Sequence, residues 1–140
     1  MDFVIKKAVN SAPLEVPVAA AIVHDGEVIS YATNGVESSN VPWSHAEFIA
    51  ISMALKKLNT RYLDHSSIYI TLEPCAFCSA LLEKVRIKDI FFGAYDPKCG
   101  AIFHNIKLFD SSLIKPNIIG GIQEEKCSAI IRDFFIKLRE

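Results

Sequence analysis

The 140-residue sequence lacks any apolar run that approaches the roughly 20 residues a helix needs to span a bilayer. It also lacks the pattern of a signal peptide, because the short apolar stretch after Met1 ends at the lysine pair Lys6-Lys7. No internal repeat, low-complexity tract or linker interrupts the chain. These absences predict a cytoplasmic protein without a membrane segment.

Neither sign of charge is in marked excess, since 15 Lys and Arg residues against 16 Asp and Glu residues leave a formal net charge of −1. Broad, nonspecific nucleic-acid binding is expected of strongly basic domains, so this class is disfavoured, although a local basic patch is not. Cysteines are few as well: Cys75, Cys78, Cys99 and Cys127. In a reducing compartment, the close pair Cys75 and Cys78 indicates a metal or redox site rather than a structural disulfide.

The length fits one domain, which we expect to span residues 1–140. Asp25-Gly26 predicts a hairpin between the first two strands, and Pro74 is expected at the first position of a helix. Strands that alternate with helices predict an α/β sandwich, with a parallel crossover over residues 67–95. Apolar periodicity predicts helices over 2–12, 45–58, 74–84 and 124–138 and strands over 18–23, 28–33, 67–72, 90–95 and 117–122.

One group of residues is a candidate metal-binding site. Cys75 and Cys78 are three apart, so both sulfurs project to one side of a helical first turn, and His45 lies at the start of another helix. One imidazole and two thiolates suit Zn²⁺, and three protein ligands leave a fourth position for water, as in catalytic zinc sites. Glu47, two residues after the histidine, is then the candidate general base and general acid.

Each of these residues also has a plainer interpretation. The C-x-x-C spacing alone is compatible with a redox pair or with chance. Glu47 can close a capping box with Ser44 at the helix start. A fourth ligand, for which only Cys99 and His104 are obvious candidates, would make the zinc structural rather than catalytic.

The motif H-x-E…P-C-x-x-C is typical of zinc nucleobase deaminases. With Thr71-Leu72-Glu73-Pro74-Cys75 and Gly93-Ala94-Tyr95-Asp96-Pro97-Lys98-Cys99-Gly100-Ala101, the chain resembles the bacterial tRNA-specific adenosine deaminase family over nearly its whole length. The resemblance implies the cytidine-deaminase-like fold, a three-layer α/β/α sandwich with a five-stranded mixed sheet. It also implies one zinc ion per chain and a homodimer.

The activity implied by this resemblance is the hydrolytic conversion of adenosine to inosine at the wobble position of a tRNA anticodon stem-loop. Glu47 would move protons, Asn34 and the Ala46 backbone would contact the nucleoside, and Asp96 and Lys98 would lie near the RNA. Asn34 and Asp96 also fit as turn residues, and Lys98 as a solvated cation.

Several residues depart from the family pattern. Ala20 stands where glycine is common, Tyr95 stands where arginine is usual, and Ile102-Phe103-His104 replaces Ala-Gly-Ser. These departures affect the contacts expected with RNA and leave the predicted zinc ligands unchanged. A deaminase of a free base or nucleoside, of guanine or cytosine type, therefore remains an alternative, as does a non-catalytic RNA- or partner-binding subunit in which Glu47 is only a cap.

Overall fold

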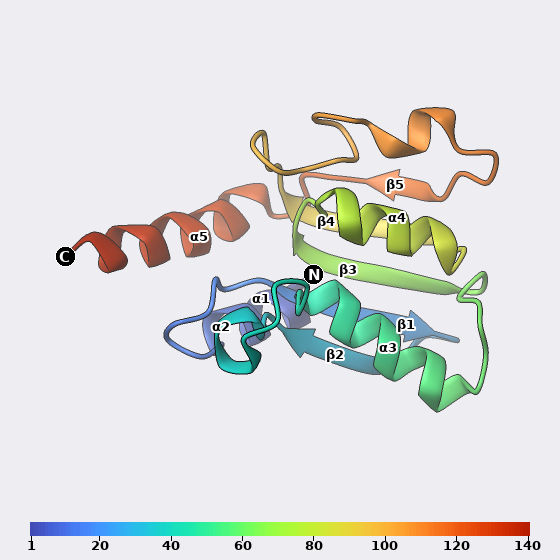
Figure 1. Ribbon diagram of the computed structural model, residues 1–140, viewed down its shortest axis with the longest axis horizontal. Helices are drawn as coiled ribbons and strands as arrows, with labels where there is room; N and C mark the ends of the chain where they lie inside the picture. The colour runs from blue at the N-terminus through green and yellow to red at the C-terminus, as the bar shows by residue number, and fades with distance from the viewer.

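The computed structural model describes residues 1–140 as one five-stranded sheet covered by helices on both faces (Figure 1). The strands are β1 (Ala19–His24), β2 (Glu27–Thr33), β3 (Ser66–Leu72), β4 (Asp89–Ala94) and β5 (Asn117–Ile119). The helices are α1 (Asp2–Val9), α2 (Val36–Ser39), α3 (Ala46–Leu58), α4 (Ala76–Lys84) and α5 (Glu124–Arg139), with a 3₁₀ turn η1 (Leu108–Ser111). None of these helices combines the length and the hydrophobicity of a membrane-spanning segment.

The sheet is mixed, with the strand order β2-β1-β3-β4-β5. β1 pairs antiparallel with both β2 and β3, whereas β3, β4 and β5 run parallel to one another. Asp25 and Gly26 form the β1–β2 hairpin with φ values of 51° and 76°, a left-handed geometry that Asp-Gly tolerates. The predicted hairpin and the predicted parallel crossover from β3 through α4 to β4 are both confirmed.

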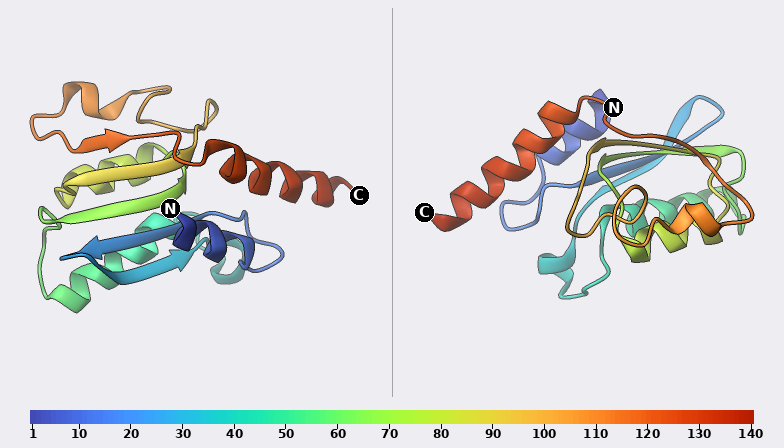
Figure 2. Two further views of the ribbon diagram at one scale, coloured as in Figure 1. Left: turned by 180° about the vertical axis from the view of Figure 1, so that it is seen from behind. Right: turned by 90° about the horizontal axis from the view of Figure 1, so that it is seen from above.

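The two faces of the sheet bury different helices, as the edge-on view in Figure 2 shows. Side chains that alternate along β1, such as Ala20 and Ile22, pack with α3 and α4 in the main core, while Ala19 and Ala21 face α1. α5 lies on the α1 side and contacts β4. The three-layer α/β/α sandwich with a five-stranded mixed sheet is therefore confirmed.

Some boundaries differ from those expected. α1 ends at Val9 rather than at residue 12, and β5 ends at Ile119 because the weakly strand-forming Gly120-Gly121 follows it. In α5 only Cys127 is buried, so the expected apolar stripe is not covered along its whole length. Figure 1 shows the reason, since the C-terminal half of α5 extends beyond the sheet.

Candidate metal centre and its surroundings

The site lies where α3 and α4 begin, at the end of the sheet at which β3 finishes (Figure 1). His45 is the N-cap residue of α3, and Cys75 is the N-cap residue of α4. The prediction that Pro74 occupies the first helical position of α4 is therefore wrong by two residues, because Ala76 is first. With Cys75 at the N-cap and Cys78 in the first turn, both sulfurs point toward His45.

The geometry of these three side chains suits one metal ion. His45 Nδ1 lies 3.6 Å from Cys75 Sγ and 3.5 Å from Cys78 Sγ, and all three ligand atoms lie within 4.8 Å of one another. Usual Zn–N and Zn–S bond lengths at tetrahedral angles place nitrogen and sulfur about 3.6 Å apart. Neither Cys99 nor His104 belongs to this group, so its donor set has three members and fits a zinc ion with an open coordination position.

The charges of the site favour a bound cation. A hydrogen bond from Cys78 lowers the pKa of Cys75 to about 4, against the effect of burial and with further help from His45. The same hydrogen bond raises the pKa of Cys78, as do burial and the nearby Glu47 carboxylate. Without a metal, one thiolate and one thiol share a proton. A divalent cation removes the repulsion that keeps the second sulfur protonated, so both can act as thiolate ligands.

Glu47 lies in the first turn of α3, buried at 5% exposure beside Cys78. Burial raises the pKa of this carboxyl to about 7, against the lowering effects of its own backbone N–H and of His45. The capping box with Ser44 does not form: the N-cap is His45, and the Ser44 hydroxyl instead accepts a hydrogen bond from Ser39. Glu47 is therefore turned toward the metal ligands rather than toward the helix end.

Asn34 and Ala46 are joined by a hydrogen bond of 2.9 Å, in which the Ala46 N–H donates to the Asn34 Oδ1 atom. Asn34, which follows β2, thus satisfies one free N–H at the start of α3 from outside the helix, in the way an N-cap side chain would. Its own N–H donates to the Val18 carbonyl. Asn34 is therefore more than a turn residue, because it connects the end of β2 to the helix that carries His45 and Glu47.

Asp96 and Lys98 lie in the loop after β4, which we call the 95–104 loop. Asp96 Oδ1 accepts the N–H groups of Lys98 and Cys99, both at 3.1 Å, so Asp96 forms the turn that its position before Pro97 suggested. The Lys98 side chain is exposed, and the structure gives it no ion-pair partner. This loop approaches the metal ligands through a β-bridge between Cys75 and Gly100.

Glu73 is a residue of this region to which the sequence assigned no role. Its side chain is fully buried, and both carboxylate oxygens hold the 95–104 loop. Oε1 accepts N–H groups of Ile102, Phe103 and His104 at 3.2, 2.8 and 3.2 Å, and Oε2 accepts the Asp96 N–H at 3.0 Å. His104 Nδ1 lies 2.8 Å from Oε2. Burial raises the pKa of Glu73, but these hydrogen bonds outweigh it, so the pKa is lowered and the carboxylate is charged.

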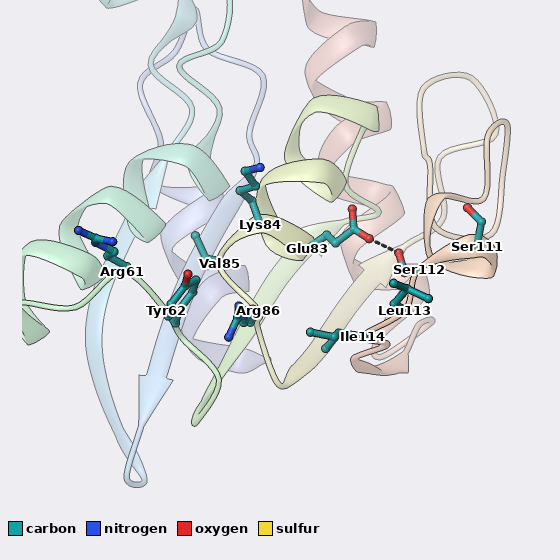
Figure 3. Close-up of a pocket in the computed structure, with 10 residues that line it drawn as sticks. All are labelled: Arg61, Tyr62, Glu83, Lys84, Val85, Arg86, Ser111, Ser112, Leu113 and Ile114. Carbon is teal, nitrogen blue, oxygen red and sulfur yellow. Dashed lines mark hydrogen bonds between the residues drawn. The ribbon is translucent and has the colours of Figure 1, made fainter.

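One surface cavity lies away from this site. It has a volume of about 640 Å³ and lies at the other end of α4, beyond Lys84, where Arg86 covers the Tyr62 ring (Figure 3). Glu83, also in its wall, accepts a hydrogen bond from Ser112. None of the predicted site residues lines this cavity.

Comparison with known proteins agrees with this arrangement. A family model described as the cytidine and deoxycytidylate deaminase zinc-binding region matches residues 1–94. Together with the sandwich fold and the three metal ligands, this match places the chain among the zinc-binding deaminases.

Individual relatives show which family of zinc-binding deaminases includes this chain. The tRNA-specific adenosine deaminase of Aquifex aeolicus is 40% identical over 89% of this chain and 83% of its own length, and that of Rickettsia bellii is 39% identical over 90% of each. A solved structure from a study of A-to-I editing by tRNA:A34 deaminases at the wobble position of transfer RNA superposes with a TM-score of 0.88. It is 32% identical and covers 93% of this chain and 96% of that chain. The chain belongs to the tRNA-specific adenosine deaminase family.

Proposed function

We propose that this protein converts adenosine to inosine at the wobble position of a tRNA anticodon by zinc-dependent hydrolytic deamination. The observation that carries the proposal is Glu47, a buried carboxyl beside a three-ligand zinc site formed by His45, Cys75 and Cys78. A buried carboxyl placed beside the metal ligands can accept a proton and later donate it. The relatives at 39–40% identity support the choice of substrate.

The chemistry needs one water molecule and two proton transfers, both of which we assign to Glu47. When bound, zinc supplies the acidity that makes a water nucleophilic at neutral pH. Glu47 accepts the proton that the water loses and gives it to N1 of the adenine ring as the bond from oxygen to C6 forms. It then moves the remaining hydroxyl proton to the amino group, the C6–N bond breaks, and ammonia leaves with inosine as the product.

Four further residues are proposed to contact the RNA. The Oδ1 atom of Asn34 is occupied by the Ala46 N–H, so its amide NH₂ is the group that donates to a bound nucleoside. The Ala46 backbone, at the start of α3 and hydrogen-bonded to Asn34, is proposed to line the nucleoside pocket. Asp96 shapes the 95–104 loop, and the exposed Lys98 offers a cation to a phosphate.

The decisive experiment compares the wild-type chain with Glu47→Gln on an anticodon stem-loop RNA and on free guanine, cytosine and adenosine, with inosine and ammonia as readouts. Glu125→Gln is the matched control, because Glu125 is an exposed carboxyl in α5. We expect full zinc content in all three proteins and inosine from the stem-loop. Turnover of Glu47→Gln should fall by about 10²–10⁴-fold or more. In the same assay, Asn34→Ala and Lys98→Ala should raise KM for the RNA.

Two outcomes would contradict the proposal. Ammonia released from free bases but not from the stem-loop would instead indicate the small-molecule deaminase. Unchanged turnover in Glu47→Gln would remove the proton-transfer role of Glu47.

We also propose that the protein is a homodimer that acts in the cytoplasm, where its tRNA substrate is found. The outer surface of α3 and α4 supports an interface between two copies of the chain. Phe48 and Phe77 are in ring contact across these helices at 6.2 Å, and Phe77 is 46% exposed. Large apolar side chains grouped on one face are typical of interfaces.

A further inference from the structure

Three aromatic side chains in the 95–104 loop lie together on the surface: Tyr95, Phe103 and His104. We call this group the aromatic platform. The ring centroids of Tyr95 and Phe103 are 6.0 Å apart, and those of Tyr95 and His104 are 6.2 Å apart. Tyr95 is 36% exposed, Phe103 is 46% exposed, and the His104 side chain is 33% exposed. Each ring therefore packs against its neighbours while keeping part of its surface in solvent.

The platform joins side chains from the two ends of the 95–104 loop. Tyr95 stands at one end, Phe103 and His104 stand at the other, and the ring of Tyr95 contacts both of the other rings. A single aromatic residue could be accidental, but three that pack together form a surface.

The platform is rigidly supported from below. Phe92, which is fully buried, contacts Tyr95 at 5.2 Å and Phe103 at 5.9 Å between ring centroids. Glu73 binds the backbone N–H groups of Phe103 and His104 and the His104 imidazole. A surface that is ordered before its ligand arrives loses little conformational entropy on binding.

The platform is also close to the zinc site along the chain and through space. Tyr95 directly follows β4, whose last residue, Ala94, accepts the N–H of Glu73 at 2.8 Å. The Ala101 N–H donates to the Pro74 carbonyl at 2.9 Å, next to the metal ligand Cys75. The backbone of the loop that carries the platform therefore runs beside the residues that lead into Cys75, and the exposed Lys98 belongs to the same loop.

We propose that the aromatic platform stacks an unpaired base of the RNA next to the deaminated adenosine. This inference rests on the proposed RNA substrate and adds a specific contact to it. Unpaired bases in RNA loops are commonly bound by stacking on aromatic side chains, and this interaction tolerates any base identity. His104 suits the role because Glu73 holds its ring by the Nδ1 edge, which leaves a ring face available. Phe103 has the largest exposed fraction of the three residues.

The test uses zinc-loaded protein in a Glu47→Gln background, so that RNA binds without turnover. The probe is an anticodon stem-loop with the fluorescent base 2-aminopurine on either side of the target adenosine. Stacking on an aromatic ring quenches its emission. Phe103→Leu keeps an apolar side chain against Phe92 but removes the ring, and Phe103→Tyr restores a ring. Tyr62→Leu is the control, since Tyr62 is 40% exposed in the cavity at the other end of α4 (Figure 3).

We expect quenching at one flanking position in the parent, in Phe103→Tyr and in Tyr62→Leu. Phe103→Leu should lose it and bind the stem-loop at least about fivefold more weakly, at unchanged zinc content and melting temperature. Suppose that Phe103→Leu binds and quenches like the parent, while the active chain still forms inosine in the unlabelled stem-loop. The stacking proposal is then refuted, and the proposed function stands. If the active chain forms no inosine there, the proposed function itself fails.

Discussion

The replacement Glu73→Gln tests whether one buried carboxylate holds the 95–104 loop in place. Glutamine has almost the same shape, so the change removes the charge and converts one acceptor oxygen to a donor. The amide oxygen is expected to take the place of Oε1, because three N–H groups converge there. The NH₂ group must then face the N–H of Asp96, which lies 3.0 Å from the present Oε2 atom. The imidazole of His104 can adapt by changing tautomer.

The cost follows from these contacts. A buried N–H left without an acceptor costs about 1–3 kcal/mol, and each hydrogen bond to a neutral rather than a charged acceptor loses about 1 kcal/mol. The lower desolvation cost of a neutral amide offsets part of this loss. We therefore expect Glu73→Gln to lower the free energy of unfolding by about 2–4 kcal/mol, a large fraction of the 5–15 kcal/mol typical of a domain.

The assay is urea unfolding at a fixed excess of zinc, combined with hydrogen exchange of individual amides. Glu83→Gln is the control, because the Glu83 carboxylate accepts the Ser112 hydroxyl at the surface of α4 and no backbone N–H. Exchange should accelerate at Asp96, Phe103 and His104 and stay slow in β3. A loss of stability within about 0.5 kcal/mol of that in Glu83→Gln, with unchanged exchange in the loop, would refute the reasoning.

Two other predictions concern packing and assembly. A Cβ atom at Gly93 would lie 2.2 Å from Cys127 Sγ and 3.0 Å from the Thr71 carbonyl, so Gly93→Ala should cost about 1–3 kcal/mol in urea unfolding. Adding Cys127→Ala should recover only part of the lost stability, since the Cys127 Cβ atom is itself 2.8 Å from the Cβ position at Gly93. If the free-energy changes of the two substitutions simply add in the double variant, the contact between these residues is contradicted. Light scattering should give twice the chain mass for the wild type. Phe77→Lys places a charge in the proposed interface and should give the mass of one chain. A monomeric wild type would exclude the homodimer.

The sequence was most informative where a structural or chemical property depends on nearby residues. The spacing of Cys75 and Cys78, the hairpin at Asp25-Gly26 and the period of the buried strands are local patterns, and the structure confirms the elements they predict. The helix starts were less well predicted. Pro74 and Ser44 both have local features of helix N-termini, yet α4 and α3 begin two residues after each of them, at Ala76 and Ala46.

The reason lies in contacts from distant parts of the chain. The first N–H of α3 is satisfied by Asn34, 12 residues earlier, so Ser44 is not needed as a cap and Glu47 is free to turn toward the metal ligands. Glu73 and His104 are 31 residues apart, and no spacing rule connects them. The one available signal was chemical: a glutamate at the end of a buried strand needs several donors to remain charged.

The position of the zinc ligands also determines how the metal acts on stability. His45 follows β2 and Cys75 follows β3, but β2 and β3 are not neighbours, because β1 lies between them and pairs with both. In the folded chain, the arrangement of all three strands therefore sets the position of His45 relative to the two cysteines. Zinc that binds the folded chain in preference to the unfolded one stabilises that assembly in proportion to the logarithm of its concentration. The zinc concentration must consequently be the same when Glu73→Gln is compared with its control. A change in metal occupancy would alter the free energy of unfolding of either protein without any change in the 95–104 loop.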